Sequence, residues 1–292
     1  MTSGMRSGES ERRADGWRAD PASVRPTVLV LGGFLTSPPF YRRFRRRLRE
    51  RGAAHVLVAG IWTPDWLLAG SRGLGPIVSR AARALIEAGR VSAASPASRG
   101  APILLIGHSA GGVLGRILLA PRPFEGRPFG AAGRVAALVT LGSPLRPVPI
   151  AHHLGAAAAF AEEVSPGAFH APRVGYVSVA SAAVVGRSDG NGRERAAFRL
   201  YRSLAPDSSA GPEAGDGLVP LACALLPGAN QVVVDCLHGQ GSGGPWYGVE
   251  PAIDAWWPAA LGAWREALLA RAAAGASGDG SAGPARAGER QR

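Results

Sequence analysis

The stretch Ile103–Ala120, ILLIGHSAGGVLGRILLA, decides the fold because a sharp bend joins two apolar segments of different kinds. The first segment is short and continuously apolar, which is typical of a strand buried on both faces. The second has helical spacing and is expected to run to about Leu119. Gly107 and Gly111 flank the bend, where side chains would clash across a tight turn. The stretch therefore predicts a strand, a turn and a helix, with Ser109 at the turn.

The pattern Gly-x-Ser-x-Gly is weak by itself in this chain. Glycine accounts for 41 of 292 residues, and the pattern recurs at Gly186–Gly190 around Ser188. Ser109 has a buried strand before it and an apolar helical pattern after it. Ser188 lies instead in the polar run VVGRSDGNGRER, with no helix of the right pattern after it. The context predicts Ser109 as a nucleophile and Ser188 as a surface-loop residue.

Short apolar runs alternate with helical patterns along the rest of the chain. The predicted strands are Val24–Gly33, Ala54–Ile61, Pro102–Gly107, Arg134–Gly142, Val174–Val185 and Gln231–Leu237. The other predicted helices are Tyr41–Gly52, Gly75–Gly89 and Ala252–Ala274, the last bent near Pro258. Continuous apolar strands separated by helices indicate a doubly wound, mainly parallel sheet that is covered on both faces.

The expected organisation is one α/β domain over residues 24–274. A helical pattern around HHLGAAAAFAEEV fills a long connection, so a small lid insertion is expected at about 145–173. The two end segments, 1–23 and 275–292, are expected to be disordered because their composition cannot form a core.

The formal net charge of +12 comes from arginine alone, because the chain has 33 basic residues and no lysine. Seven arginines and one glutamate fall within Tyr41–Gly52. Phe40, just before this range, forms an apolar stripe with Phe44 and Leu48 at helical spacing. This pattern predicts an amphipathic helix with a solvated outer face. The alternative is contact of Tyr41–Gly52 with an anionic membrane. No nucleic-acid-binding motif is present, so no nucleic-acid partner is expected.

No cofactor or metal is expected, because no cluster of Cys, His and carboxylate residues has ligand spacing. Cys223 and Cys236 are expected to be buried free thiols, with a disulfide between them left open. The chain has no apolar run of membrane-span length and no secretory signal pattern near its start, which favours the cytoplasm or a plastid.

A nucleophilic serine needs a base, and the base needs an acid that orients it, in the chain order Ser, Asp or Glu, His. His238 alone among the six histidines lies on the loop directly after the last predicted strand. Asp216 lies between glycines in AGDGLVP, after the fifth predicted strand, and is the favoured acid. Asp207 and Asp189 are the alternatives.

An acyl-transfer site also needs two backbone amides that stabilise an oxyanion. The loop LGGFLTSPPF follows the first predicted strand and offers the N–H of Phe34. The residue after the nucleophile, Ala110, offers the second N–H at the start of a helix.

Together the motifs LVLGGFLTS, LLIGHSAGG, LVTLGSP and GDGLVP and the late histidine resemble the lipase/esterase branch of the α/β-hydrolase superfamily. The similarity covers roughly Val28–Trp264 and extends to the LPGA and PWYG elements. It is strongest toward lipase-like proteins of cyanobacteria, algae and plants, which resemble GPI inositol-deacylase and bacterial triacylglycerol lipases. This chain has Gly32-Gly33 where many of those relatives have His-Gly.

The resemblance implies Ser109 as nucleophile, Asp216 as acid, His238 as base, and Phe34 and Ala110 as oxyanion donors. We therefore expect a serine carboxylic-ester hydrolase acting on an apolar or lipid ester. The alternatives are an acyltransferase or thioesterase with the same triad, and a catalytically silent protein of this fold that docks on membranes.

Overall fold

A six-stranded parallel sheet forms the centre of the chain. The computed structural model describes residues 17, 19–146, 152–204 and 211–278. The strand order is β2-β1-β3-β4-β5-β8, and every neighbouring pair is parallel. The strands are β1 (Thr27–Leu31), β2 (His55–Val58), β3 (Ile103–His108), β4 (Val135–Leu141), β5 (Gly175–Ser181) and β8 (Asn230–Val234). The predicted doubly wound α/β fold is confirmed.

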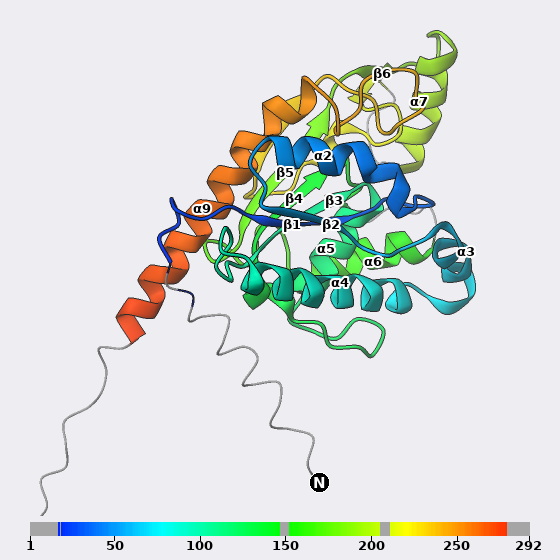
Figure 1. Cartoon of the computed structure of the whole chain (residues 1–292). Helices are drawn as coiled ribbons and strands as arrows, with labels where there is room; N and C mark the ends of the chain where they lie inside the picture. Colours follow the sequence, from blue (N-terminus) through cyan, green and yellow to red (C-terminus); the bar gives the residue numbers. More distant parts are fainter. Residues whose placement is uncertain (1–16, 18, 147–151, 205–210, 279–292) are drawn as a thin grey trace, which may run out of the picture.

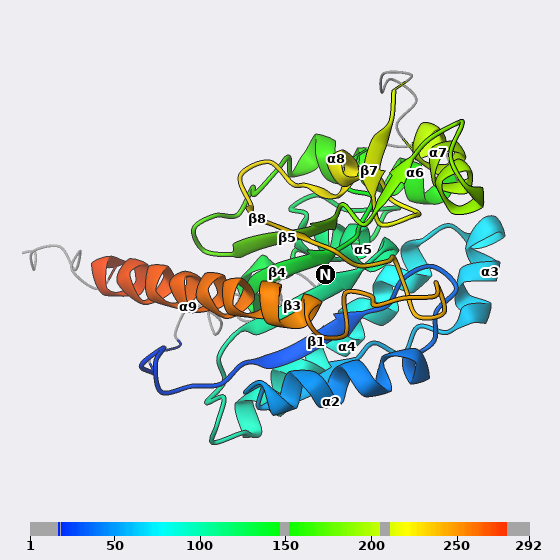
Figure 2. The same ribbon diagram turned by 90° about the horizontal axis from the view of Figure 1, so that it is seen from above.

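Helices cover both faces of this sheet (Figures 1 and 2). One face packs on α2 (Arg42–Glu50) and α9 (Ala252–Gly278), and the other on α4 (Gly75–Ala94), α5 (Ala110–Leu119) and α6 (His152–Val164). Side chains of β1 alternate between the faces, so Leu29 and Leu31 enter one core and Val28 and Val30 the other. This double burial explains why the strands are continuously apolar in the sequence.

The predicted strand Val174–Val185 is wrong as a single element. The chain leaves the main sheet after Ser181, whose hydroxyl donates to Cys236 O at 2.6 Å and accepts from Ala183 N at 3.1 Å. It then forms β6 (Val184–Gly186), which pairs antiparallel with β7 (Glu213–Gly215) in a separate two-stranded sheet. The helix α7 (Gly192–Leu204) lies between these two strands in the chain.

Several short elements were not predicted. They are η1 (Pro38–Tyr41), α3 (Thr63–Arg72), η2 (Ala131–Arg134), α7 and α8 (Leu221–Ala224). Ser188 lies exposed in a turn, as expected, but α7 begins shortly after it, at Gly192. The absence of a helix behind Ser188 is therefore a wrong reason for excluding it. The right reason is that no buried strand leads into it from the central sheet.

Described structure continues on both sides of the expected domain, residues 24–274. Trp17 donates its indole N–H to Arg99 O at 2.9 Å, and Ser23 N donates to Asp20 O in a turn over residues 19–23. At the other end α9 continues to Gly278, past the expected boundary at 274. The disorder expected for 1–16 and 279–292 concerns residues outside the described ranges. None of the described helices is long and apolar enough to cross a membrane.

Within the expected lid segment 145–173, α6 packs into the core. Ala157, Ala158 and Ala161 are buried against the layer that contains α5. Buried Arg116 of α5 joins the two helices, because it donates to Leu145 O, Ala161 O and Ser165 O and pairs with Glu162 at 2.8 Å. The helix therefore forms part of the covering layer.

We predict that Arg116→Leu lowers the free energy of unfolding by about 3 kcal/mol, because three buried carbonyl groups and one carboxylate lose their donor. Urea denaturation followed by circular dichroism measures this loss. Arg122→Gln is the matched control, since Arg122 follows α5 and pairs with Glu163 of α6, but this ion pair is exposed. It should change stability by less than about 1 kcal/mol. Equal losses in the two variants would contradict the role given to Arg116.

Candidate active site

The turn between β3 and α5 places Ser109 at a strained backbone position. Its φ and ψ angles are 54° and −127°, a conformation that non-glycine residues rarely adopt. A Cβ atom on Gly107 would lie 2.4 Å from the Gly112 backbone, and one on Gly111 would lie 2.2 Å from Leu31 O. Close backbone packing therefore leaves no room for a side chain at Gly107 or Gly111.

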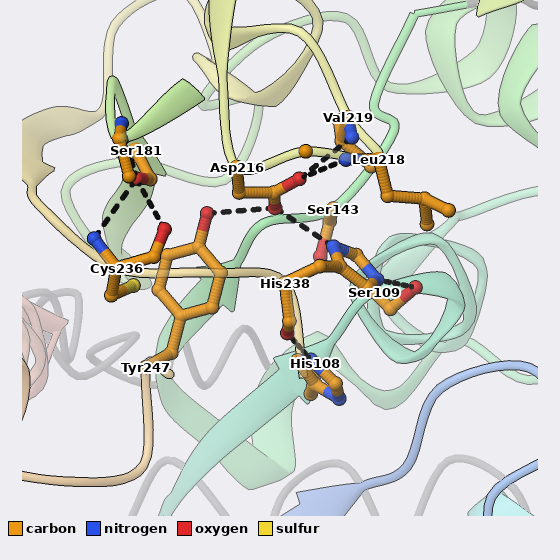
Figure 3. Close-up of polar contacts among 12 residues, drawn as sticks. His108, Ser109, Ser143, Ser181, Asp216, Leu218, Val219, Cys236, His238 and Tyr247 are labelled. Carbon is orange, nitrogen blue, oxygen red and sulfur yellow. Dashed lines mark hydrogen bonds and ion pairs between the residues drawn. The ribbon is translucent and has the colours of Figure 1, made fainter. Parts of the chain in front are cut away.

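Ser109, His238 and Asp216 form a hydrogen-bonded chain (Figure 3). His238 Nδ1 lies 2.7 Å from Asp216 Oδ2, and His238 Nε2 lies 2.9 Å from Ser109 Oγ. With the Nδ1 proton donated to the carboxylate, Nε2 is free to accept the hydroxyl proton of Ser109. The structure therefore brings together the three residues that the sequence assigned to nucleophile, base and acid.

The Asp216 carboxylate is buried and fully engaged. Oδ1 accepts from the amides of Leu218 and Val219 at 2.9 and 2.7 Å, and Oδ2 accepts from Tyr247 at 2.9 Å in addition to His238. Burial alone would raise the pKa of Asp216, but the charge and hydrogen bond of His238, with the two amides, hold it below its ordinary value. The carboxylate therefore stays ionised beside the imidazole. Tyr247 belongs to the PWYG element of the sequence, for which no role was predicted.

The alternative acids do not take this place in the described structure. Asp189 is exposed in the turn before α7. Asp207 lies outside the described residues.

The loop after β1 lies directly against the nucleophile. A Cβ atom on Gly33 would be 2.8 Å from Ser109 Cβ, so only glycine fits there. Phe34 follows in the turn and lines the same cavity as Ser109. Within the described residues, neither the Phe34 nor the Ala110 amide donates to a protein acceptor. The role of these two amides as oxyanion donors therefore stays a prediction.

A second histidine, His108, connects the loops around Ser109. His108 Nε2 donates to His238 O at 2.8 Å, and His108 Nδ1 lies 2.9 Å from the Tyr41 hydroxyl. That hydroxyl also accepts from Gly33 N at 2.9 Å. Since Nε2 carries the proton, Nδ1 accepts from Tyr41. The oxyanion loop and the base loop are thereby joined through the residue before the nucleophile.

His108 is neutral in this network. Burial lowers its pKa to about 3, and the charge of His238 acts in the same direction. The rings of Phe40 and Trp246 pack against it with centroids at 6.4 and 5.2 Å. The surroundings therefore select the neutral ring.

A cavity of about 390 Å³ opens at Ser109 and His238. Its volume is within the range of small-ligand sites. Its apolar lining comes from Phe34, Phe40, Leu218 and Leu237. None of the described residues of 145–173 lines it, so a lid function for that segment stays a prediction.

Neither cysteine takes part in the hydrogen bonds of the candidate triad. Cys223 and Cys236 are both buried and free, as expected. Burial raises the pKa of Cys223 to about 11, so this thiol remains protonated near neutral pH. Among the described residues, no group of three or more His, Cys, Asp and Glu side chains is arranged to hold a metal ion.

The strand order, the elbow after β3 and the chain order Ser, Asp, His are those of an α/β-hydrolase fold. Searches with protein-family models and among curated proteins give no match. Among solved structures the chain is similar to apo esterase 2 of Thermogutta terrifontis, at 16% identity and a TM-score of 0.45, covering 87% of this chain and 86% of that one. It is also similar to phospholipase PlaB of Legionella pneumophila, at 12% identity and a TM-score of 0.48, covering 82% and 59%. The roles assigned to residues of this chain rest on its own geometry.

We predict that His108→Gln weakens the dependence of stability on pH in mild acid. Between about pH 6.5 and pH 3 the unfolded His108 binds a proton that the folded one does not, so this residue makes stability fall as pH falls. Removing it should reduce the slope by up to about 1.4 kcal/mol per pH unit. Urea titrations at pH 4.5 to 7 measure the slope, and an unchanged slope in the variant would contradict a neutral, buried His108.

Proposed function

We propose that the protein is a serine carboxylic-ester hydrolase of the lipase/esterase branch. The observation that carries this proposal is the hydrogen-bonded chain from Asp216 through His238 to Ser109, with Ser109 at the mouth of a cavity. A serine hydroxyl becomes a useful nucleophile only beside a base that is itself oriented. The position of Gly33 against Ser109 supports it too, because the loop that carries the Phe34 amide lies beside the serine.

In the proposed reaction, Ser109 Oγ attacks the ester carbonyl carbon while His238 Nε2 takes the hydroxyl proton. The ionised Asp216 stabilises the imidazolium and holds its tautomer. The Phe34 and Ala110 amides donate to the oxyanion of the tetrahedral intermediate, near the positive end of α5. His238 then returns the proton to the leaving alcohol, which leaves an acyl group on Ser109.

Water completes the cycle by the same steps in reverse order. His238 removes a proton from water, the resulting hydroxide attacks the acyl carbonyl, and Ser109 leaves with that proton as the acid product is released. An alcohol in place of water would make the protein an acyltransferase, and a thioester in place of the ester would make it a thioesterase. Product analysis with and without an added alcohol separates transfer from hydrolysis.

The substrate proposed for this site is an ester with an apolar part. Phe34 and Leu218 line the cavity while remaining 47% and 39% exposed, so apolar surface is offered at its mouth. Covering such surface with an acyl chain would remove it from water. A lipid ester is one member of this class.

We predict that a fluorophosphonate probe labels Ser109 and that Ser109→Ala loses both labelling and hydrolysis of p-nitrophenyl acyl esters. The expected loss of kcat is at least about 10³-fold, because nucleophile and base act as a unit. Mass spectrometry of the labelled peptide locates the probe. Circular dichroism confirms that the variant is folded, and Ser188→Ala is the matched control from the second Gly-x-Ser-x-Gly pattern. Absence of labelling in the unaltered protein would favour a catalytically silent member of this fold.

We also propose that α2 contacts an anionic membrane. Arg42, Arg43 and Arg49 are exposed on this helix, while Phe44 and Leu48 face the core. Of the remaining four arginines, three pair with acids: Arg46 with Glu50, Arg47 with Glu250, and Arg51 with Glu250 and Asp254. The fourth, Arg45, is half-buried and donates to Val56 O at 3.2 Å. The exposed three give α2 a basic outer face suited to anionic headgroups.

We predict salt-sensitive co-sedimentation with vesicles that contain phosphatidylserine, and little with vesicles of phosphatidylcholine alone. Replacing Arg42, Arg43 and Arg49 by Gln should reduce the bound fraction several-fold. The control replaces Arg72, Arg83 and Arg90, which are exposed on α3 and α4 and give the same change in charge. Equal reductions in both triple variants would contradict a specific role of α2.

A further inference from the structure

Arg193 places a positive charge on the wall of the cavity at Ser109. It belongs to the first turn of α7 and lines the cavity together with Ser109, His238 and Ser242. The other lining groups are apolar, uncharged polar, or part of the candidate triad. Neither esterase chemistry at Ser109 nor the fold requires a cation at this place.

The backbone around Arg193 is fixed by local hydrogen bonds. Asn191 Oδ1 accepts from the amides of Arg193 and Glu194 at 3.0 and 3.1 Å, and the Glu194 carboxylate accepts from Asn191 N at 2.7 Å. These bonds cap the start of α7 and leave the Glu194 carboxylate engaged. The side chain of Arg193 therefore extends from a defined point.

The body of α7 is attached to the loop that carries Asp216. Tyr201 of α7 is buried, donates to Val184 O at 3.2 Å and accepts from Gly217 N at 2.8 Å. Since Gly217 follows Asp216 directly, the position of α7 is tied to the triad. The backbone of Arg193 is thus held in a set place relative to the candidate triad, and its exposed side chain reaches the cavity from there.

The Arg193 guanidinium group has more hydrogen-bond donors than its contact with Ser242 uses. Arg193 Nη2 donates to Ser242 O at 3.2 Å, across the loop that follows His238. Within the described part of the chain, no carboxylate lies at ion-pair distance from it. A guanidinium carries five N–H donors in a planar fork, which matches a carboxylate or phosphate group. The Ser242 carbonyl is neutral, so among the described residues the positive charge has no carboxylate partner.

We propose that Arg193 forms an anion subsite, so that the preferred substrates are esters bearing a carboxylate or phosphate group within reach of the ester bond. This inference rests on the proposed hydrolase function and specifies its substrate class. The apolar lining holds the carbon chain of such a substrate, and Arg193 pairs with its charged end. Arg193 is a specificity-determining residue that does not touch the reacting atoms.

The test compares p-nitrophenyl hemiglutarate with p-nitrophenyl pentanoate, which has the same chain length but ends in a methyl group. Arg193→Gln should lower kcat/KM for the hemiglutarate about fivefold to tenfold, mainly through KM, because a partly exposed charged hydrogen bond is lost. The pentanoate should change by less than about twofold. High salt should reduce the preference for the hemiglutarate in the unaltered protein.

Two further variants separate charge from structure. Arg193→Lys keeps the positive charge and should retain part of the preference for the hemiglutarate. If Arg193 acted only by holding Ser242 in place, the preference would not depend on the charge at position 193. Arg199→Gln is the matched control, since Arg199 is exposed on the same helix and does not line the cavity. It should leave both esters unaffected.

Inhibition of pentanoate hydrolysis shows whether the subsite prefers a carboxylate or a phosphate group. Glutarate and inorganic phosphate are compared, and whichever inhibits the unaltered protein more than Arg193→Gln is the group that the subsite prefers. Where turnover is slow, protection of Ser109 from the fluorophosphonate by each anion gives the same comparison.

Equal losses for both esters in Arg193→Gln, or no change in preference or in inhibition by either anion, would overturn the anion subsite while leaving the hydrolase function intact. Absence of both turnover and labelling in the unaltered protein would overturn the proposed function and, with it, the subsite.

Discussion

The close approach of Gly111 to the Leu31 carbonyl oxygen is the constraint on which the rest of the site depends. It presses the start of α5 against the end of β1, which is possible only because neither Gly107 nor Gly111 carries a side chain. The turn must then pass through Ser109 with a positive φ. The same contact brings the loop after β1 to Ser109, so the strained serine and the nearby amides proposed as oxyanion donors are consequences of one packing arrangement.

Asp216 and His238 lie next to Ser109 because backbone hydrogen bonds join the loops that carry them. His238 N donates to Asp216 O at 3.0 Å, and Leu237 N donates to Pro245 O at 2.7 Å. Ser181 fixes the end of β8 by accepting from Cys236 N and donating to Cys236 O. These bonds position the imidazole through backbone atoms, while Tyr247 and His108 secure the carboxylate and the loop from either side.

Much of this arrangement could be predicted from the sequence because it follows from local patterns. Double burial produces the apolar strands, and the position of His238 after the last strand identifies it without reference to any contact. The Tyr41–His108 network could not be predicted in this way, since it joins residues 67 positions apart and neither is unusual in its local context. The segment β6, α7 and β7 could not be predicted for a related reason. Val184 continues the apolar run of β5 in the sequence, and only the hydrogen bond from Ser181 to Cys236 O shows where the strand ends. The turn at Asp20 is likewise set by Trp17 packing on a distant segment.

The complete burial of α5 has a consequence for how the candidate site unfolds locally. All ten residues of this helix are buried, so it has no side that faces solvent. Amide hydrogens in such an element exchange only through large-scale opening, whereas surface loops open at much lower free energy. Asp216 and His238 lie on loops, whereas Ser109 directly precedes α5, whose amide hydrogens are expected to exchange slowly. A partial opening would therefore detach the acid and base while the nucleophile stays in place, and closing the loops again would restore a complete site without refolding the core.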